Sequence, residues 1–130
     1  MKETILFAAI IAAAGFSSVA NSAQHMSVAI GQMESGAGKI LTDAEGMSLY
    51  TFDKDSAGKS VCNGECAVKW PPLMATKTTK SVGDFTVIKR ADGSYQWAQD
   101  GNPLYTWFKD TEVGDTTGDG VKGVWHLARP

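Results

Sequence analysis

From residue 39 onward, short runs of apolar and β-favouring residues are separated by turns that contain glycine. Ser94–Gln99 alternates polar and apolar residues, which is typical of a strand with one buried face. Lys39–Thr42 and Leu49–Phe52 flank the turn Asp43–Gly46, and together they predict a hairpin. Strand-sized runs recur about every 8–12 residues, which indicates an antiparallel meander. The expected strands cover residues 39–42, 49–52, 85–90, 94–99, 104–108 and 123–128.

Helical patterning is scarce. Glu65–Trp70 predicts one helical turn, which Pro71 ends because proline cannot continue a helix. We expect no long amphipathic helix after Ala23. The expected fold class is therefore all-β: a small antiparallel meander or sandwich-like domain that follows an N-terminal signal peptide.

The segment Met1–Ala23 has the pattern of that signal peptide. Its apolar run, Ile5–Phe16, is shorter than the ~20 residues that cross a bilayer. Small residues follow this run, so cleavage is expected after Ala20 or after Ala23. Residues 24–38 are expected to form a flexible arm, and residues 39–130 the folded domain. These features predict a periplasmic or secreted protein with no membrane span after cleavage.

One heptapeptide occurs twice. Residues 49–55 read LYTFDKD and residues 104–110 read LYTWFKD, with five identical positions at an offset of 55 residues. The same offset carries Trp70 onto Trp125. We therefore expect two divergent copies of one unit, at about residues 39–84 and 85–130.

The motif aromatics have two possible roles. Tyr50 and Phe52 should share one face of a strand, as should Tyr105 and Trp107, because side chains two residues apart point the same way. The four rings can fill a small β core, or they can form an exposed platform for a ligand. The binding candidates also include one tryptophan per copy, Trp70 and Trp125.

Asp55 and Asp110 each end a motif just beyond a strand. A carboxylate at such a position commonly accepts hydrogen bonds from the backbone of a turn. A catalytic carboxylate pair is the alternative, and it requires the two groups to lie within ~5–10 Å of each other.

Cys62 and Cys66 are the two cysteines of the chain, and they occur in one copy alone. In an oxidising compartment a disulfide is the expected state. A helix would hold the two Cβ atoms ~5–6 Å apart, whereas a disulfide needs ~3.5–4.5 Å. Asn63-Gly64 permits a tighter turn that could close this gap. Redox chemistry is the weaker alternative, because the spacing differs from that of thioredoxin-like motifs.

A metal site has few candidate ligands. Two reduced thiolates with His126 would suit copper or zinc. Residues 115–120 (DTTGDG) resemble the first half of a calcium loop, but position twelve is His126 instead of glutamate. We expect a glycine-rich loop there, with a weak calcium site as the alternative, and we expect no cofactor.

The duplicated motif resembles the repeated Tyr-x-(Phe/Trp/Tyr)-x-x-Asp motif of secreted-repeat proteins that are often labelled predicted lipoproteins. The Cys-x-x-x-Cys run that leads to Trp70–Leu73 and the closing segment Gly123–His126 are also similar to that family. The resemblance spans about residues 38–130. It implies a secreted location and a repeat, but no reaction. The lipobox cysteine of the lipoprotein members is missing, which favours a soluble form.

Composition narrows the functional classes. The 130 residues carry 12 basic and 14 acidic side chains without a basic stripe, so nucleic-acid binding is not expected. There is no Gly-x-Ser-x-Gly elbow, phosphate loop or dinucleotide fingerprint. We expect a monomeric, non-enzymatic binding or accessory module whose ligand or protein partner in the cell envelope is unknown. The alternative is a redox or metal-handling accessory protein that uses Cys62 and Cys66.

Overall fold

A computed structural model describes residues 30–130, so the expected signal peptide and residues 24–29 of the expected arm lie outside the described residues. This part of the chain consists mainly of short strands and contains little helix, which confirms the all-β class. The elements in chain order are β1 (Ile30–Ser35), β2 (Gly38–Asp43), β3 (Tyr50–Phe52), α1 (Glu65–Lys69), β4 (Met74–Ala75), β5 (Phe85–Lys89), β6 (Tyr95–Gln99), β7 (Asn102–Pro103), the 3-10 helix η2 (Val121–Gly123) and β8 (Trp125–Leu127).

Each copy begins with an antiparallel hairpin. In the first copy β1 pairs with β2 from Ile30↔Asp43 to Ser35↔Gly38, and in the second β5 pairs with β6 from Phe85↔Gln99 to Lys89↔Tyr95. Residues 30–38 therefore differ from the flexible arm that their composition predicted. They are ordered because β1 pairs with β2 along its whole length, and because Ile30 and Met33 pack against the buried clusters.

The turn between β6 and β7 follows the prediction. Asp100 and Gly101 both have positive φ, 50° and 84°, as a two-residue type I′ hairpin turn requires. The strand expected at residues 104–108 is wrong: Tyr105 makes two isolated bridges there, one with Tyr50 and one with Pro72. Pro72 has no N–H group, so it cannot donate to a longer ladder.

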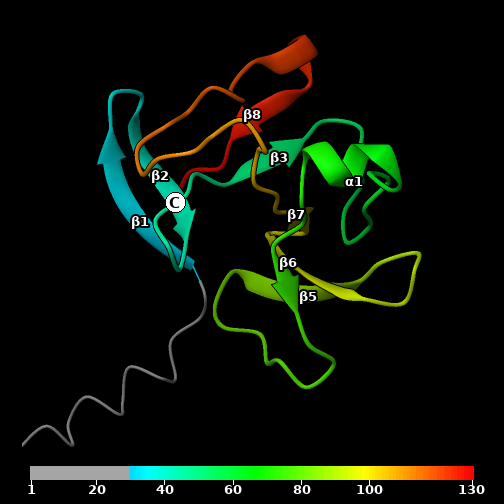
Figure 1. Cartoon of the computed structure of the whole chain (residues 1–130). Coiled ribbons are helices and arrows are strands. Elements are labelled where there is room, and N and C mark those ends of the chain that lie inside the picture. Colours follow the sequence, from blue (N-terminus) through cyan, green and yellow to red (C-terminus); the bar gives the residue numbers. More distant parts are fainter. Residues whose placement is uncertain (1–29) are drawn as a thin grey trace, which may run out of the picture.

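The two copies complete each other's sheets. β3 of the first copy pairs with β8 of the second, from Tyr50↔Leu127 to Phe52↔Trp125, and Figure 1 shows these strands side by side. The segment after Trp70 in the first copy in turn pairs with the motif of the second: Leu73 N–H donates to the Leu104 carbonyl (2.9 Å). A simple meander thus describes β5, β6 and β7, whereas β3 and β8 pair across most of the chain.

Two apolar clusters form the core, and both draw residues from each copy. The first consists of Ile40, Tyr50, Cys62, Trp70, Tyr105, Trp125 and Leu127. The second consists of Leu41, Leu49, Trp97, Leu104 and Ala128. Neither copy could bury its own apolar face without the other.

Candidate functional site

The two motif tyrosines lie where the copies meet. Tyr50 N–H donates to the Tyr105 carbonyl (2.8 Å), and Tyr105 N–H donates to the Tyr50 carbonyl (3.0 Å). Since the two residues are equivalent in the repeat, this reciprocal pair relates the copies by an approximate two-fold axis. Both side chains are fully buried. The core interpretation of these tyrosines is confirmed, and the version in which they form an exposed platform is wrong.

Their hydroxyl groups cross between the copies. Tyr50 Oη donates to Asp110 Oδ2 and Tyr105 Oη donates to Asp55 Oδ2, each at 2.6 Å. Burial is the main reason why the pKa of each tyrosine is well above its usual range. The tyrosines therefore remain neutral donors at physiological pH.

The second oxygen of each motif carboxylate is also occupied. Asp55 Oδ1 accepts the Val61 N–H (2.8 Å), and Asp110 Oδ1 accepts the Thr117 N–H (3.0 Å). Burial raises the pKa of Asp55 above its usual value, although the hydrogen bonds from Tyr105 and Val61 act in the opposite direction. These contacts support the structural interpretation of the motif aspartates, since each links a turn to the other copy's tyrosine.

Above the tyrosines, four aromatic rings form one continuous stack, which we call the aromatic column. The centroid distances are 4.1 Å for Phe52–Trp125, 3.7 Å for Trp125–Trp70 and 3.9 Å for Trp70–Trp107. The tyrosines meet the two inner tryptophans edge-on, in the pairs Tyr50–Trp70 and Tyr105–Trp125. The column alternates between the copies, so each copy contributes one inner and one outer ring.

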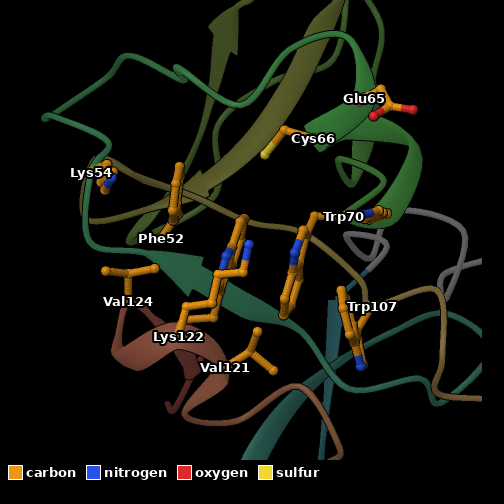
Figure 2. Close-up of a pocket in the computed structure, with 11 residues that line it drawn as sticks. Phe52, Lys54, Glu65, Cys66, Trp70, Trp107, Val121, Lys122 and Val124 are labelled. Carbon is orange, nitrogen blue, oxygen red and sulfur yellow. The ribbon is translucent and has the colours of Figure 1, made fainter.

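A groove runs along the column, with α1 on one side and η2 on the other (Figure 2). Its volume is about 320 Å³. Several lining positions are equivalent in the two copies: Phe52 with Trp107, Cys66 with Val121, Lys69 with Val124, and Trp70 with Trp125. The groove therefore lies across the approximate two-fold axis, and a single copy could not form it.

The rim of the groove is less symmetric than its floor. Lys54, Lys69 and Lys122 line it together with one acidic residue, Glu65. The equivalent of Lys122 in the first copy is Ala67, and Lys109, the equivalent of Lys54, does not line the groove. Charge is thus placed unequally on a symmetric aromatic floor.

Cys62 and Cys66 form the predicted disulfide. Cys62 is buried just before α1, and Gly64 between them has a φ of 60°, a left-handed conformation that suits glycine. The bond therefore closes a non-helical turn in front of the helix. Cys66 itself lines the groove beside Trp70.

Arg90 is a buried residue that the sequence did not single out. Its guanidinium group donates to Gln96 Oε1 (2.7 Å), Ser60 Oγ (3.0 Å) and the Cys62 carbonyl (2.7 Å). Ser60 Oγ in turn lies 2.6 Å from Tyr105 Oη. An arginine at the end of a strand is usually solvated, and no sequence signal distinguishes this one.

The proposed metal ligands do not come together in the described residues. His126 Nε2 lies 2.8 Å from Asp53 Oδ2 at the surface, and the two cysteine sulfurs are bonded to each other. Within residues 30–130 there is no group of three or more His, Cys, Asp or Glu side chains that could hold a metal ion. In the calcium-like loop, Asp115 caps the Thr111 and Glu112 N–H groups, and Asp119 accepts the Leu127 N–H.

A family model described as a secreted repeat of unknown function matches the chain twice, at residues 31–74 and at residues 86–129. The chain belongs to this secreted-repeat family. The matches confirm the resemblance seen in the motifs, and the first match includes most of β1 in the repeat. No curated protein and no solved structure matches the chain. Of the helices in residues 30–130, none is long and apolar enough to cross a membrane.

Proposed function

We propose that this secreted-repeat chain is a non-enzymatic binding module of the periplasm or the secreted fraction, and that a small molecule binds in the groove along the aromatic column. The main observation behind this proposal is that both copies line one apolar groove, which lies across their approximate two-fold axis. Concave, largely apolar sites with a few placed polar groups are typical of small-molecule binding.

The divergence of the copies supports this proposal. Positions that hold the fold together are alike: each copy has a buried tyrosine, an aspartate that accepts the hydroxyl of the other copy's tyrosine, and an inner tryptophan. Positions on the rim differ, as in Lys69 against Val124 and Lys122 against Ala67. A duplicated scaffold that is symmetric in its core and asymmetric at its groove is consistent with one specialised site.

The groove lining favours binding over catalysis. Among the described residues that line it, Glu65 is the one carboxylate, and no serine or histidine is present. The lining residues therefore supply no hydroxyl nucleophile with an adjacent base. Asp55 and Asp110 hold turns and tyrosine hydroxyls instead.

The four tryptophan side chains allow a direct test by NMR. A set of neutral, anionic and cationic naphthalene derivatives should shift the indole N–H signals of Trp70, Trp107 and Trp125. Trp97 belongs to the second core cluster and does not line the groove, so its signal should stay in place. If no compound of the set moves the three groove signals, the proposal is wrong.

A groove-filling variant and a matched control variant test where the compounds bind. Val121→Phe places a larger side chain on the groove wall and should abolish the shifts. Val82→Phe enlarges an exposed valine that does not line the groove, and it should leave the shifts unchanged. If Val82→Phe remains folded and loses the shifts to the same extent, binding in the groove is contradicted.

The redox alternative has one favourable observation: Cys66 of the disulfide lines the groove. Equilibration in glutathione or dithiothreitol buffers of known potential, followed by thiol alkylation and intact mass, tests it. Structural disulfides of secreted proteins remain oxidised down to about −300 mV. Reduction of the disulfide at clearly higher potentials would favour a redox role. The metal-handling version would be supported if the reduced protein, but not the oxidised protein, bound copper or zinc.

A further inference from the structure

We infer that the ligand of the groove is a small organic anion: a planar apolar body that carries a carboxylate group. This inference rests on the proposed function and adds the charge and shape of the ligand. The groove volume of about 320 Å³ lies near the lower end of small-molecule pockets, which suits a one- or two-ring body.

The charge of the rim opposes that of the chain. The chain has a formal net charge of −2, yet three lysines and one glutamate line this groove. Within residues 30–130, Lys54, Lys69 and Lys122 form no ion pair with a carboxylate. Three exposed ammonium groups and one carboxylate leave an excess of positive charge around an apolar floor, which favours an anionic ligand.

The backbone at Lys122 is a second, independent observation. Lys122 has a φ of 53°, so a residue with a long side chain occupies the left-handed region between Val121 and Gly123. This conformation is routine for glycine and occasional for asparagine or aspartate, and it costs free energy for a lysine. Strain of this kind is concentrated at functional sites, and here it holds a lysine on the groove rim (Figure 2).

The inner tryptophans provide a third observation. Trp70 and Trp125 are 4% and 3% exposed, and neither indole N–H donates to an acceptor within residues 30–130. Buried indole N–H groups usually have a partner. Because both rings line the groove, a ligand with acceptor oxygens could satisfy them there.

The geometry of the column argues against two other ligand classes. The two inner rings have both faces covered by their neighbours in the stack, so they present only their edges to the groove. Cations are attracted to ring faces, whereas ring edges carry partial positive charge. A cation, or a sugar that needs an open ring face to stack on, therefore fits this floor less well than an anion does.

The experiment compares three probes of one shape: 1-naphthoate, 1-naphthamide and 1-naphthylmethylammonium. Titrations of the full-length mature protein follow the indole signals of Trp70, Trp107 and Trp125. The inference predicts that 1-naphthoate binds at least about fivefold more tightly than 1-naphthamide, and the ammonium compound most weakly. Raising the salt concentration should reduce this preference, because the lysines are exposed.

Lysine variants locate the effect. Lys122→Gln should weaken naphthoate binding about threefold and leave naphthamide binding unchanged. The matched control is Lys109→Gln, since Lys109 is the repeat equivalent of Lys54 but lies outside the groove lining. Its naphthoate affinity should equal that of the wild type.

The possible outcomes distinguish a failure of the anion preference from a failure of small-molecule binding in the groove. If naphthoate and naphthamide shift the groove signals with equal affinity, or if Lys109→Gln weakens binding as much as Lys122→Gln, the anion inference fails while the groove remains a binding site. If none of the three probes shifts the groove signals, the anion inference fails, and the proposed function fails in this test as well.

Discussion

Each motif residue acts mainly through its partner in the other copy. Tyr50 reaches Asp110 and Tyr105 reaches Asp55, so the Tyr–Asp spacing within one motif does not describe a contact within that motif. The two carboxylates also differ in surroundings, because Ser60 and Arg90 extend the hydrogen-bond network on the Asp55 side alone. The same substitution should therefore have different effects in the two copies.

Asp55 should leave a signature in the pH dependence of stability. Its pKa is raised in the folded state, chiefly by burial, so the folded protein binds this proton more tightly than the unfolded chain does. The resulting contribution to stability is full below the unfolded value of 3.8 and is lost as the pH rises through the raised pKa. The free energy of unfolding of wild type minus that of Asp55→Asn should therefore increase as the pH falls through this range. Urea titrations at several pH values measure this difference, and a difference that shrinks toward low pH would contradict the assignment.

Lys122 should show an inverted preference between glycine and alanine. Glycine adopts the left-handed conformation at position 122 without strain, whereas alanine is strained there as lysine is. The glycine variant should therefore be the more stable by about 1 kcal/mol. Lys89, an exposed residue within β5, is the control, because there alanine should be the more stable replacement. Chemical denaturation gives both comparisons, and the same order at the two sites would refute the strain at Lys122.

At the scale of elements, short segments depend on contacts outside themselves. α1 has five residues, too few for an independent helix, and it is anchored by the disulfide and by Trp70 at its end. The loop before η2 lies against the rings of Tyr50, Trp70 and Trp107. Gly118 in this loop donates its N–H to Tyr50 Oη (3.1 Å), which brings the backbone close to the rings.

Gly118→Ala should be strongly destabilising for a steric reason. An added Cβ would lie 2.9 Å from Trp70 Cη2 and 2.9 Å from Tyr50 Cζ, and both rings are buried. We expect a loss of about 1–3 kcal/mol, typical of overpacking, as measured by thermal and urea unfolding. Gly36→Ala is the matched control, since its Cβ would meet nothing within 4 Å. Equal stability of the two variants would mean that the rings adjust freely.

At the scale of the whole molecule, the copies are interlocked. β8 of the second copy pairs with β3 of the first, and β4 of the first copy pairs with β6 of the second. Both apolar clusters also mix residues from the two copies. The domain should therefore unfold as one cooperative unit despite its internal repeat.

Removing either tyrosine hydroxyl tests this coupling. Tyr50→Phe and Tyr105→Phe each leave a carboxylate of the other copy without its donor, so each should cost about 1–3 kcal/mol. Circular dichroism and tryptophan fluorescence should report the same single transition in both variants. Tyr95→Phe serves as the control, because the Tyr95 hydroxyl has no hydrogen bond within the described residues, and it should change stability by less than about 0.5 kcal/mol. Two separated transitions would contradict the interlocked fold.

Local patterns were enough for much of this architecture. A run of apolar and β-favouring residues predicted the strand at residues 85–90, alternation predicted the strand at residues 94–99, and glycine marked the turn at Asp100–Gly101. The disulfide could also be predicted from the sequence, since Cys62 and Cys66 are close together in the chain. The expectation failed at residues 30–38, where a polar and glycine-containing composition concealed a strand that is ordered by its partner.

By itself, the sequence determined the fold class and the duplication and favoured the disulfide, because periodicity, self-similarity and residue spacing can be read along the chain without knowledge of its tertiary contacts. Tertiary structure decided which strands pair, which carboxylates accept the hydroxyls of Tyr50 and Tyr105, and that Arg90 is buried. It also decided that rings from two motifs form one column beside a lysine-rimmed groove. A strand's side-chain pattern specifies which face is buried but not which distant segment covers it, so the site emerged only when the two copies were placed together.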